Sequence, residues 1–313
     1  LSVSDTAFQQ VDAVVPGSVY HDLLMNELIE DPFQGANEIE ALKLMDHDFT
    51  YERCFEADQD FLEADQLVLR AEGLDTLAQI YLNGEKVGEA DNMHRIWEYN
   101  VTSLVKEGTN ELKVVLASPT RWIKEAYKKS PQAGSSDAME GFPLLRKAHC
   151  MFGWDWGPHL PDAGIWREIS LIGIETARIQ DVRVHQIHED GKVTCEVITR
   201  ERKAKNAELT TQITITGPDG EVCTGSGEDV LIAIPDPKLW WPNGFGDQPL
   251  YTVLVRLMQG EKELDRWEKR IGLRTLTMHV EKDQWGESFC HQVNGVDIFA
   301  MGADYIPEDN LLP

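Results

Sequence analysis

Residues 78–87 read AQIYLNGEKV. Ala78, Ile80 and Leu82 alternate with other residues, which is the period of a strand that buries one face. An Asn-Gly pair follows them, and both of its residues tolerate the positive φ of a type I′ turn, so the pair favours a tight reversal between two antiparallel strands. The stretch therefore predicts a β-hairpin.

The same pattern recurs along most of the chain. Apolar residues alternate at 67–71, 112–116, 182–184, 193–197, 213–215 and 253–257, and turn residues such as Asp190-Gly191 stand between several of these segments. Closely spaced strands joined by such turns indicate β-sandwiches. Helical patterns are scarce, and we expect only short helices within residues 18–27, with Ser18 as N-cap, and within residues 120–129. The sequence predicts an all-β protein.

The length of 313 residues is typical of about two domains. We place the boundaries after residues 177 and 279, where one series of strands closes and the next begins. The last segment, 280–313, contains one strand that looks buried, residues 298–301, and is too short to form a domain of its own. We therefore expect the chain to be a truncated piece of a longer protein, with a poorly packed tail.

Composition excludes several classes of partner. The 54 acidic and 29 basic residues give a net charge of −25, which opposes binding to nucleic acid or to an anionic membrane surface. No apolar run is long enough for a transmembrane helix, and residues 1–20 lack the pattern of a signal peptide. The five cysteines form no CxxC motif, and the nine histidines show no metal spacing. We expect no metal, no cofactor and a cytoplasmic location.

Residues 151–167, MFGWDWGPHLPDAGIWR, carry the clearest chemical signal. An indole packs against the C–H face of a sugar ring, and a carboxylate makes strong hydrogen bonds to its hydroxyl groups. Trp154, Asp155 and Trp156 supply both groups, and the glycines and prolines beside them predict a bent loop on which the groups converge. The residues alone leave open a second interpretation, in which both tryptophans pack at a domain junction.

The chain resembles the N-terminal part of a glycoside hydrolase family 2 enzyme, most closely the β-mannosidase branch. The resemblance rests on motifs in family order: VPGSVYHDLL (15–24), DPFQGANE (31–38), LDTLAQIYLNGEKVGEADNMHR (74–95), FGWDWGP (152–158), GIWREISL (164–171), LWWPNGFGDQPLYTVLV (239–255), RIGLRTL (270–276) and VNGVDIFAMGADYIPED (293–309). FGWDWGP selects the β-mannosidase branch.

The resemblance implies a jelly-roll β-sandwich (1–177), an immunoglobulin-like β-sandwich (178–279) and the first strand of a truncated (β/α)8 barrel. It implies an exo-acting retaining β-mannosidase that releases terminal β-D-mannose from oligosaccharides or glycosides. Retaining glycosidases use two carboxyl groups, and in this family both are glutamates on late barrel strands. We therefore expect no catalytic residue in this chain, and no activity from it alone.

The same resemblance implies which residues bind substrate. Trp154, Asp155 and Trp156 are expected to line the sugar pocket. Arg146 is expected to orient Asp155 or a hydroxyl group, as its neighbour Lys147 could, although both residue types are by default solvated at the surface. Asp304 follows the expected barrel strand at its carboxyl end, where barrel enzymes build their sites. Trp166 is expected in the core.

Three alternatives remain at this point. The first is another family 2 activity, such as exo-β-glucosaminidase or β-galactosidase. The second is a free-standing carbohydrate-binding module, and the third an adhesion protein of immunoglobulin-like domains. A homodimer also remains open.

Overall fold

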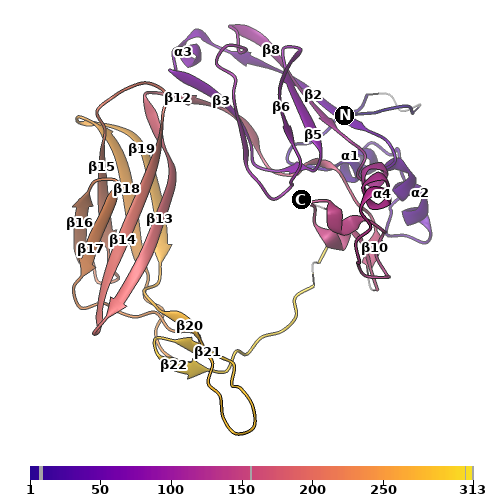
Figure 1. Cartoon of the computed structure of the whole chain (residues 1–313). Helices are drawn as coiled ribbons and strands as arrows, with labels where there is room; N and C mark the ends of the chain where they lie inside the picture. The colour runs from indigo at the N-terminus through magenta and orange to yellow at the C-terminus, as the bar shows by residue number, and fades with distance from the viewer. Residues whose placement is uncertain (7–9, 156, 307, 312–313) are drawn as a thin grey trace. The chain divides into compact units, whose positions relative to one another are not determined.

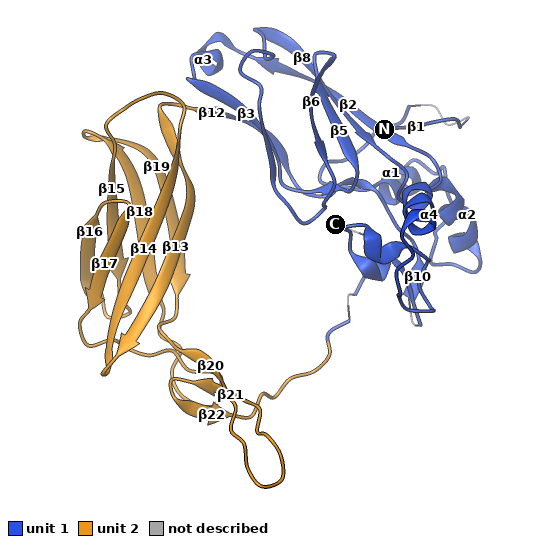
Figure 2. Ribbon diagram, viewed as in Figure 1, with its two compact units in different colours: residues 1–173, 305–313 blue, residues 174–304 orange. Residues whose placement is uncertain are grey.

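The chain folds into two compact units in the computed structural model (Figures 1 and 2). The structure describes residues 1–6, 10–155, 157–306 and 308–311. One unit comprises residues 1–173 and 305–313, and the other residues 174–304. This division differs from the expected boundaries after residues 177 and 279. No helix among the described residues is long and apolar enough to span a membrane.

The first unit is a β-sandwich. Its larger sheet has the order β1-β2-β8-β5-β6, and a smaller sheet has the order β12-β3-β7. The strands of the larger sheet are β1 (Ser2–Val3), β2 (Phe49–Ala57), β8 (Gly108–Leu116), β5 (Ala78–Leu82) and β6 (Glu85–Ala90). Those of the smaller sheet are β12 (Ile169–Ile174), β3 (Gln66–Ala71) and β7 (Trp97–Asn100). Two short pairs accompany them, β4 (Leu74–Asp75) with β11 (Gly164–Ile165) and β9 (Phe152–Trp154) with β10 (Gly157–His159).

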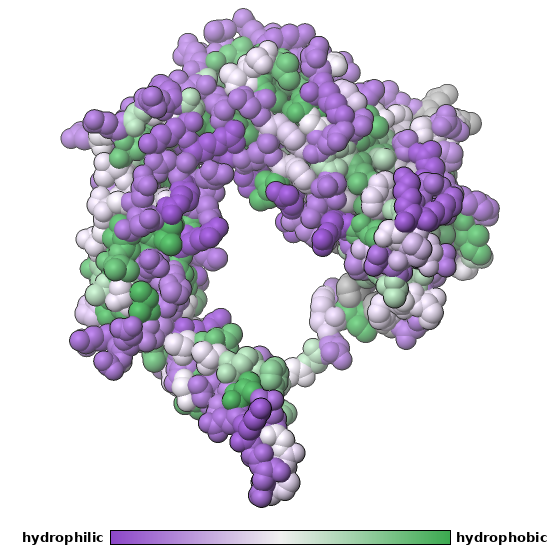
Figure 3. Space-filling model, in the orientation of Figure 1, coloured by the Kyte–Doolittle hydropathy of each residue, from purple (hydrophilic) through white to green (hydrophobic). Residues whose placement is uncertain are grey.

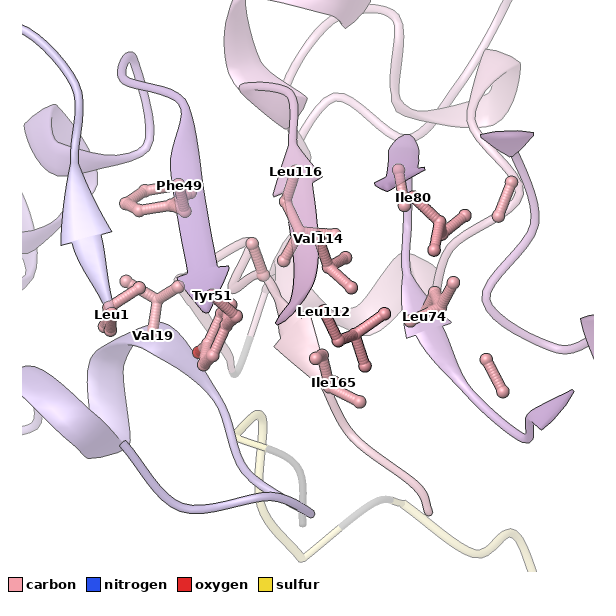
Figure 4. Close-up of a cluster of buried hydrophobic side chains, with 14 of the residues drawn as sticks. Leu1, Val19, Phe49, Tyr51, Leu74, Ile80, Leu112, Val114, Leu116 and Ile165 are labelled. Carbon is pink, nitrogen blue, oxygen red and sulfur yellow. The ribbon is translucent and has the colours of Figure 1, made fainter. Parts of the chain in front are cut away.

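The core of this unit forms from the residues that alternate along its strands. Ile80 and Leu82 of β5 are buried with Val114 and Leu112 of β8, their direct partners in the sheet. Alternate residues of β3 join the same cluster, as do side chains from the first helix (Figure 4). The alternation of residues 78–82 thus correctly predicted a strand that buries one face.

The turn that joins β5 to β6 has the predicted geometry. Asn83 has φ 52° and Gly84 φ 84°, which are the left-handed values that a type I′ turn requires. Asp190 and Gly191 adopt the same region, with φ 49° and 73°, between two long strands of the second unit.

Helices are short and few, as expected. They are α1 (Val19–Met25), α2 (Asn37–Leu44), α3 (Gln59–Leu62), α4 (Pro119–Lys129) and the 3-10 turns η1 (Phe142–Leu144) and η2 (His149–Met151). The predicted cap is confirmed, because the Ser18 side chain accepts a hydrogen bond from the His21 amide. Helix α2 was not predicted from the sequence. It has no side-chain cap at its first turn and buries only Ala41.

The second unit contains an immunoglobulin-like β-sandwich. One sheet has the order β13-β14-β17 and the other β16-β15-β18-β19. Their bounds are β13 (Ala177–Glu189), β14 (Lys192–Lys203), β15 (Thr210–Thr216), β16 (Val222–Ser226), β17 (Asp229–Ile234), β18 (Tyr251–Gln259) and β19 (Lys262–Ile271). Alternate residues of β14, β15, β17 and β18 form one buried cluster.

A third, small sheet of this unit has the order β20-β21-β22. It comprises β20 (Leu276–His279), β21 (Cys290–Val293) and β22 (Val296–Ile298). The strand expected at residues 298–301 is not formed beyond Ile298, and Phe299 and Met301 are each 82% exposed. A barrel strand is held by hydrogen bonds to strands on both sides, and no such neighbours occur in the described part of the chain.

The rest of the tail returns to the first unit. The Asn310 side chain donates a hydrogen bond to the Pro158 carbonyl (3.1 Å), and Leu311 packs against the first core. Hydrophilic residues dominate the face drawn in Figure 3, in keeping with a charged fraction of 27%.

Candidate functional site

The tryptophan-rich stretch forms a tight hairpin of β9 and β10. Trp154 pairs with Gly157, and Phe152 pairs with His159, so the chain reverses through Asp155. The bent loop expected from the glycines is therefore present. Trp156, the third residue expected in the sugar site, lies outside the described residues.

Gly153 shows why this hairpin needs a glycine. Its φ is 99°, in the region that other residues rarely adopt, and a Cβ atom at this position would lie 2.5 Å from the His159 ring. The imidazole can therefore lie directly against the backbone of β9 only because residue 153 has no side chain.

His159 holds the hairpin in place from two sides. Its amide donates to Glu38 Oε1 of α2 (2.7 Å), and its Nδ1 lies 3.1 Å from the same oxygen. Its Nε2 lies 3.0 Å from the Asp137 carbonyl oxygen. Both ring nitrogens thus lie within hydrogen-bonding distance of oxygen atoms, one from α2 and one from the backbone of residue 137.

A small apolar cluster supports the base of the hairpin. Phe152 is fully buried with Phe142, Ile123 and Leu145. The rings of Phe152 and Phe142 lie 6.2 Å apart, in a tilted arrangement. The Met139 amide donates to the Phe152 carbonyl (3.0 Å). One end of the hairpin is thus fixed in a core, and the turn lies at the other end.

The turn end of the hairpin exposes an indole and a carboxylate. Trp154 is 44% exposed, and Asp155 is exposed at the turn. The Asp155 carboxylate has no hydrogen-bond or ion-pair partner within the described ranges. An indole of this exposure offers a face for stacking, and an unpaired carboxylate offers acceptors to hydroxyl groups.

Arg146 lies on a neighbouring segment with a rigid backbone. Its carbonyl accepts a hydrogen bond from the Met93 amide (3.0 Å), and it forms a β-bridge with Asn92. The Met93 carbonyl in turn accepts from the Trp166 indole (3.1 Å). The Arg146 side chain is exposed and makes no hydrogen bond or ion pair to any residue that the structure describes. No contact joins it to Asp155, so the expected orienting role stays a prediction.

Lys147 was expected to be a solvated surface residue, and the structure corrects this expectation. Its side chain is fully buried and forms an ion pair with Asp75 of β4. Asp75 also accepts a hydrogen bond from the Thr76 hydroxyl. A buried ion pair is stable only when both charges stay paired, so this contact ties the Arg146 segment to the sandwich. The 72 residues that separate the partners leave no local signal for it.

Asp162 is a second buried charge that the sequence analysis missed. It follows the hairpin, is 1% exposed, and accepts hydrogen bonds from the amides of Tyr20 (3.1 Å) and Ala163 (2.8 Å). Burial raises its pKa from 3.8 to about 6, against the opposing effects of the Ser18 hydroxyl and the Lys147 charge. It joins the start of α1 to the segment that leaves the hairpin.

The remaining expected residues lie elsewhere. Asp304 belongs to the second unit, where it is exposed in a segment without regular structure. Trp166 is half-buried rather than in the core: its indole lies against Gly73, and the Arg167 guanidinium stacks on it at 4.1 Å. Trp240 of the second unit packs on Gly272 beneath Arg274.

The family places its acid/base glutamate in an Asn-Glu pair, and the chain contains three such pairs, at residues 26–27, 37–38 and 110–111. All belong to the first unit rather than to a barrel. Glu38 is occupied by His159, and the Asn110 side chain is buried against the backbone of its own turn. None of the three pairs therefore lies in the barrel setting that the family resemblance implies for the acid/base glutamate.

Comparisons with known proteins agree with this architecture. Residues 2–167 match the family described as "Glycosyl hydrolase 2 galactose-binding domain-like", and residues 177–274 match "Glycosyl hydrolases family 2". Beta-mannosidase B of Aspergillus fumigatus is 35% identical over 325 aligned residues, which cover 100% of this chain and 38% of that protein.

Two solved structures show similar folds. Beta-D-mannosidase from Dictyoglomus thermophilum is 34% identical with a TM-score of 0.93, covering 100% of this chain and 40% of its own. A β-glucuronidase from Ruminococcus gnavus is 16% identical with a TM-score of 0.58, covering 82% of this chain and 39% of its own, and shares the fold alone. The chain thus spans about two fifths of the length of the β-mannosidases that it matches. By the family match over more than half of its residues, the chain belongs to glycosyl hydrolase family 2.

Proposed function

We propose that this chain forms the N-terminal, non-catalytic part of an exo-acting retaining β-mannosidase, and that the hairpin of β9 and β10 forms one wall of its sugar pocket. The observation that carries the proposal is the turn end of the hairpin, where Trp154 and the Asp155 carboxylate are exposed together. The similarity of the whole chain to part of two β-mannosidases supports the choice of substrate class.

The two side chains have different tasks in this proposal. Asp155 accepts a hydrogen bond from a sugar hydroxyl, while Trp154 stacks on the C–H face of the ring. His159 and Phe152 act indirectly, because they fix the hairpin without contacting substrate. Positioning of this kind matters, since a displacement of about 1 Å can cost roughly a hundredfold in rate.

Arg146 and Asp304 are two further residues that we propose to bind substrate. Arg146 has an exposed, unpaired guanidinium beside a rigid backbone, which suits it to a hydroxyl group or to Asp155. Asp304 is assigned by its place after the expected barrel strand. All five cysteines are free thiols, and we place the protein in the cytoplasm on that basis.

The test uses the full-length enzyme that carries this chain, assayed with aryl β-mannoside, β-glucosaminide and β-galactoside substrates. We expect β-mannoside to be preferred. Asp155→Ala removes one charged hydrogen bond, which contributes about 1.5–3 kcal/mol, so kcat/KM should fall roughly ten- to a hundredfold. Trp154→Ala should also lower kcat/KM.

Two control variants separate binding from stability. Asp247→Ala removes an exposed carboxylate of the second unit and should leave kcat/KM unchanged. Trp240→Ala removes a packed indole and should lower the melting temperature rather than kcat/KM. Wild-type kcat/KM in a folded Asp155→Ala enzyme would make the hairpin a structural element, and preference for another glycoside would assign a different family 2 activity.

A further inference from the structure

Three side chains of metal-binding type meet on the small sheet of the second unit. His279 comes from β20, Cys290 from β21 and Asp297 from β22. His279 pairs directly with Cys290, and Asp297 pairs with Gln292, two residues along β21. Because residues two apart on a strand share a face, this register places all of them on one face of the sheet.

Their donor atoms are already close together. One ligand atom of each residue lies within 4.8 Å of the other two. The Nδ1 atom of His279 is 2.8 Å from one Asp297 oxygen and 3.0 Å from the other. Zinc ligands bind at about 2.0–2.3 Å in a tetrahedron, which separates neighbouring donor atoms by roughly 3.3–3.7 Å. Small side-chain rotations therefore suffice to bring the three groups around one ion.

The surrounding contacts have the form that supports a ligand set. The second ring nitrogen of His279, Nε2, lies 3.1 Å from a Glu281 oxygen. A histidine that binds metal through one nitrogen commonly donates its other N–H to a carboxylate, which fixes the tautomer. The Gln292 side chain likewise donates to Asp297 Oδ1 (2.9 Å) and so orients that carboxylate. Neither contact uses His279 Nδ1 or Asp297 Oδ2, which lie 2.8 Å from each other and would exchange this contact for the ion.

We propose that His279, Cys290 and Asp297 form a binding site for a single Zn²⁺ ion, with water as the fourth ligand. A thiolate, an imidazole and one carboxylate suit zinc, whereas magnesium and calcium take oxygen ligands. The His279 side chain is 31% exposed and that of Asp297 is 49% exposed, so an ion can enter from solvent. Bound zinc joins all three strands and stabilises the small sheet.

Sequence spacing gave no sign of this site. The ligands lie at positions 279, 290 and 297, without the short spacings that mark zinc motifs, and only the strand register brings them together. The proposal is independent of the sugar pocket, because every residue in it belongs to the second unit.

The test titrates the metal-free 313-residue chain with Co²⁺ and then displaces it with Zn²⁺. We expect one Co²⁺ per chain, with the absorption bands of tetrahedral cobalt bound to a thiolate, and loss of those bands when Zn²⁺ is added. Zn²⁺ should also raise the melting temperature of the second unit. Cys290→Ser should abolish the cobalt–thiolate band. His279→Gln should abolish the stoichiometric binding.

Matched controls come from the same chain. Cys54→Ser removes an exposed free thiol of the first unit, and His291→Gln removes an exposed neighbour of Cys290 that points to the opposite face. Both should bind like wild type. Glu281→Gln should weaken Zn²⁺ binding by roughly 10- to 100-fold.

Two results would overturn the proposal. One is the absence of a cobalt–thiolate band in a chain whose circular dichroism shows it to be folded. The other is Co²⁺ binding that persists in the Cys290→Ser variant but is lost in the Cys54→Ser variant. In either case His279 would be a histidine paired with Glu281 and Asp297, and nothing more.

Discussion

The buried carboxyl of Asp162 makes the stability of the first unit depend on pH. Its pKa is 3.8 in an unperturbed chain and about 6 in the fold, because burial disfavours the charged form. The folded state therefore holds the proton more tightly than the unfolded state. Stability from this group is fully present below pH 3.8 and is lost as pH rises through 6.

The size of the effect follows from the same two values. With pKa values of 3.8 unfolded and about 6 folded, linkage gives a loss of about 1.4 kcal/mol between pH 5 and pH 8. Asp162→Asn cannot titrate and should lack this loss. The free energy of unfolding of wild type should therefore fall by about 1.4 kcal/mol relative to Asp162→Asn over this range.

The assay is urea unfolding of the chain at several pH values, followed by a signal from the first unit. Comparing wild type with Asp162→Asn at each pH cancels the titration of all other groups. Asp247→Asn, the same substitution at an exposed carboxylate of the second unit, serves as the matched control. The quantity compared is the free energy of unfolding of wild type minus that of Asp162→Asn. If this difference stays constant or grows with pH, the pKa of Asp162 is not raised in the fold.

Three further predictions concern the residues around the hairpin. Lys147→Ala leaves the Asp75 charge buried without its partner, so the free energy of unfolding should fall by about 3–5 kcal/mol; a loss under 1 kcal/mol in urea unfolding would show that water reaches the pair. His159→Ala removes the ring contacts to Glu38 and to the Asp137 carbonyl but keeps the amide hydrogen bond to Glu38. In the full-length enzyme it should lower kcat/KM while Phe152 keeps the fold; an unchanged value would show that the hairpin holds its position without the imidazole. The 313-residue chain alone should release no p-nitrophenol from an aryl β-mannoside, and turnover above a buffer blank would place catalytic groups within it.

Local sequence patterns predicted most of the fold. The turns at Asn83-Gly84 and Asp190-Gly191 were predictable because each pair occupies the left-handed region that its sequence favours. The cap at Ser18 was predictable for a similar reason. Helix α2 was not, because its stability comes from contacts with β10 and with the apolar residues around it rather than from its own caps.

Long-range contacts of the site were not predictable from local patterns. The composition of residues 151–167 identified the hairpin, but nothing near Lys147 indicated that Asp75 lies against it. The same is true of His279, Cys290 and Asp297, which strand register brings onto one face. The prediction of a strand at residues 298–301 was wrong. Its apolar residues suggested burial, but no neighbouring strand among the described residues covers them.

The central claim is that the hairpin of β9 and β10 contacts the sugar. It is tested most directly by a crystal structure of the full-length enzyme with a mannose-configured inhibitor bound. We predict an Asp155 carboxylate oxygen within about 2.5–3.0 Å of an inhibitor hydroxyl and the Trp154 indole against the ring. An inhibitor held entirely by other residues, with Asp155 and Trp154 in solvent or at a domain junction, would contradict it.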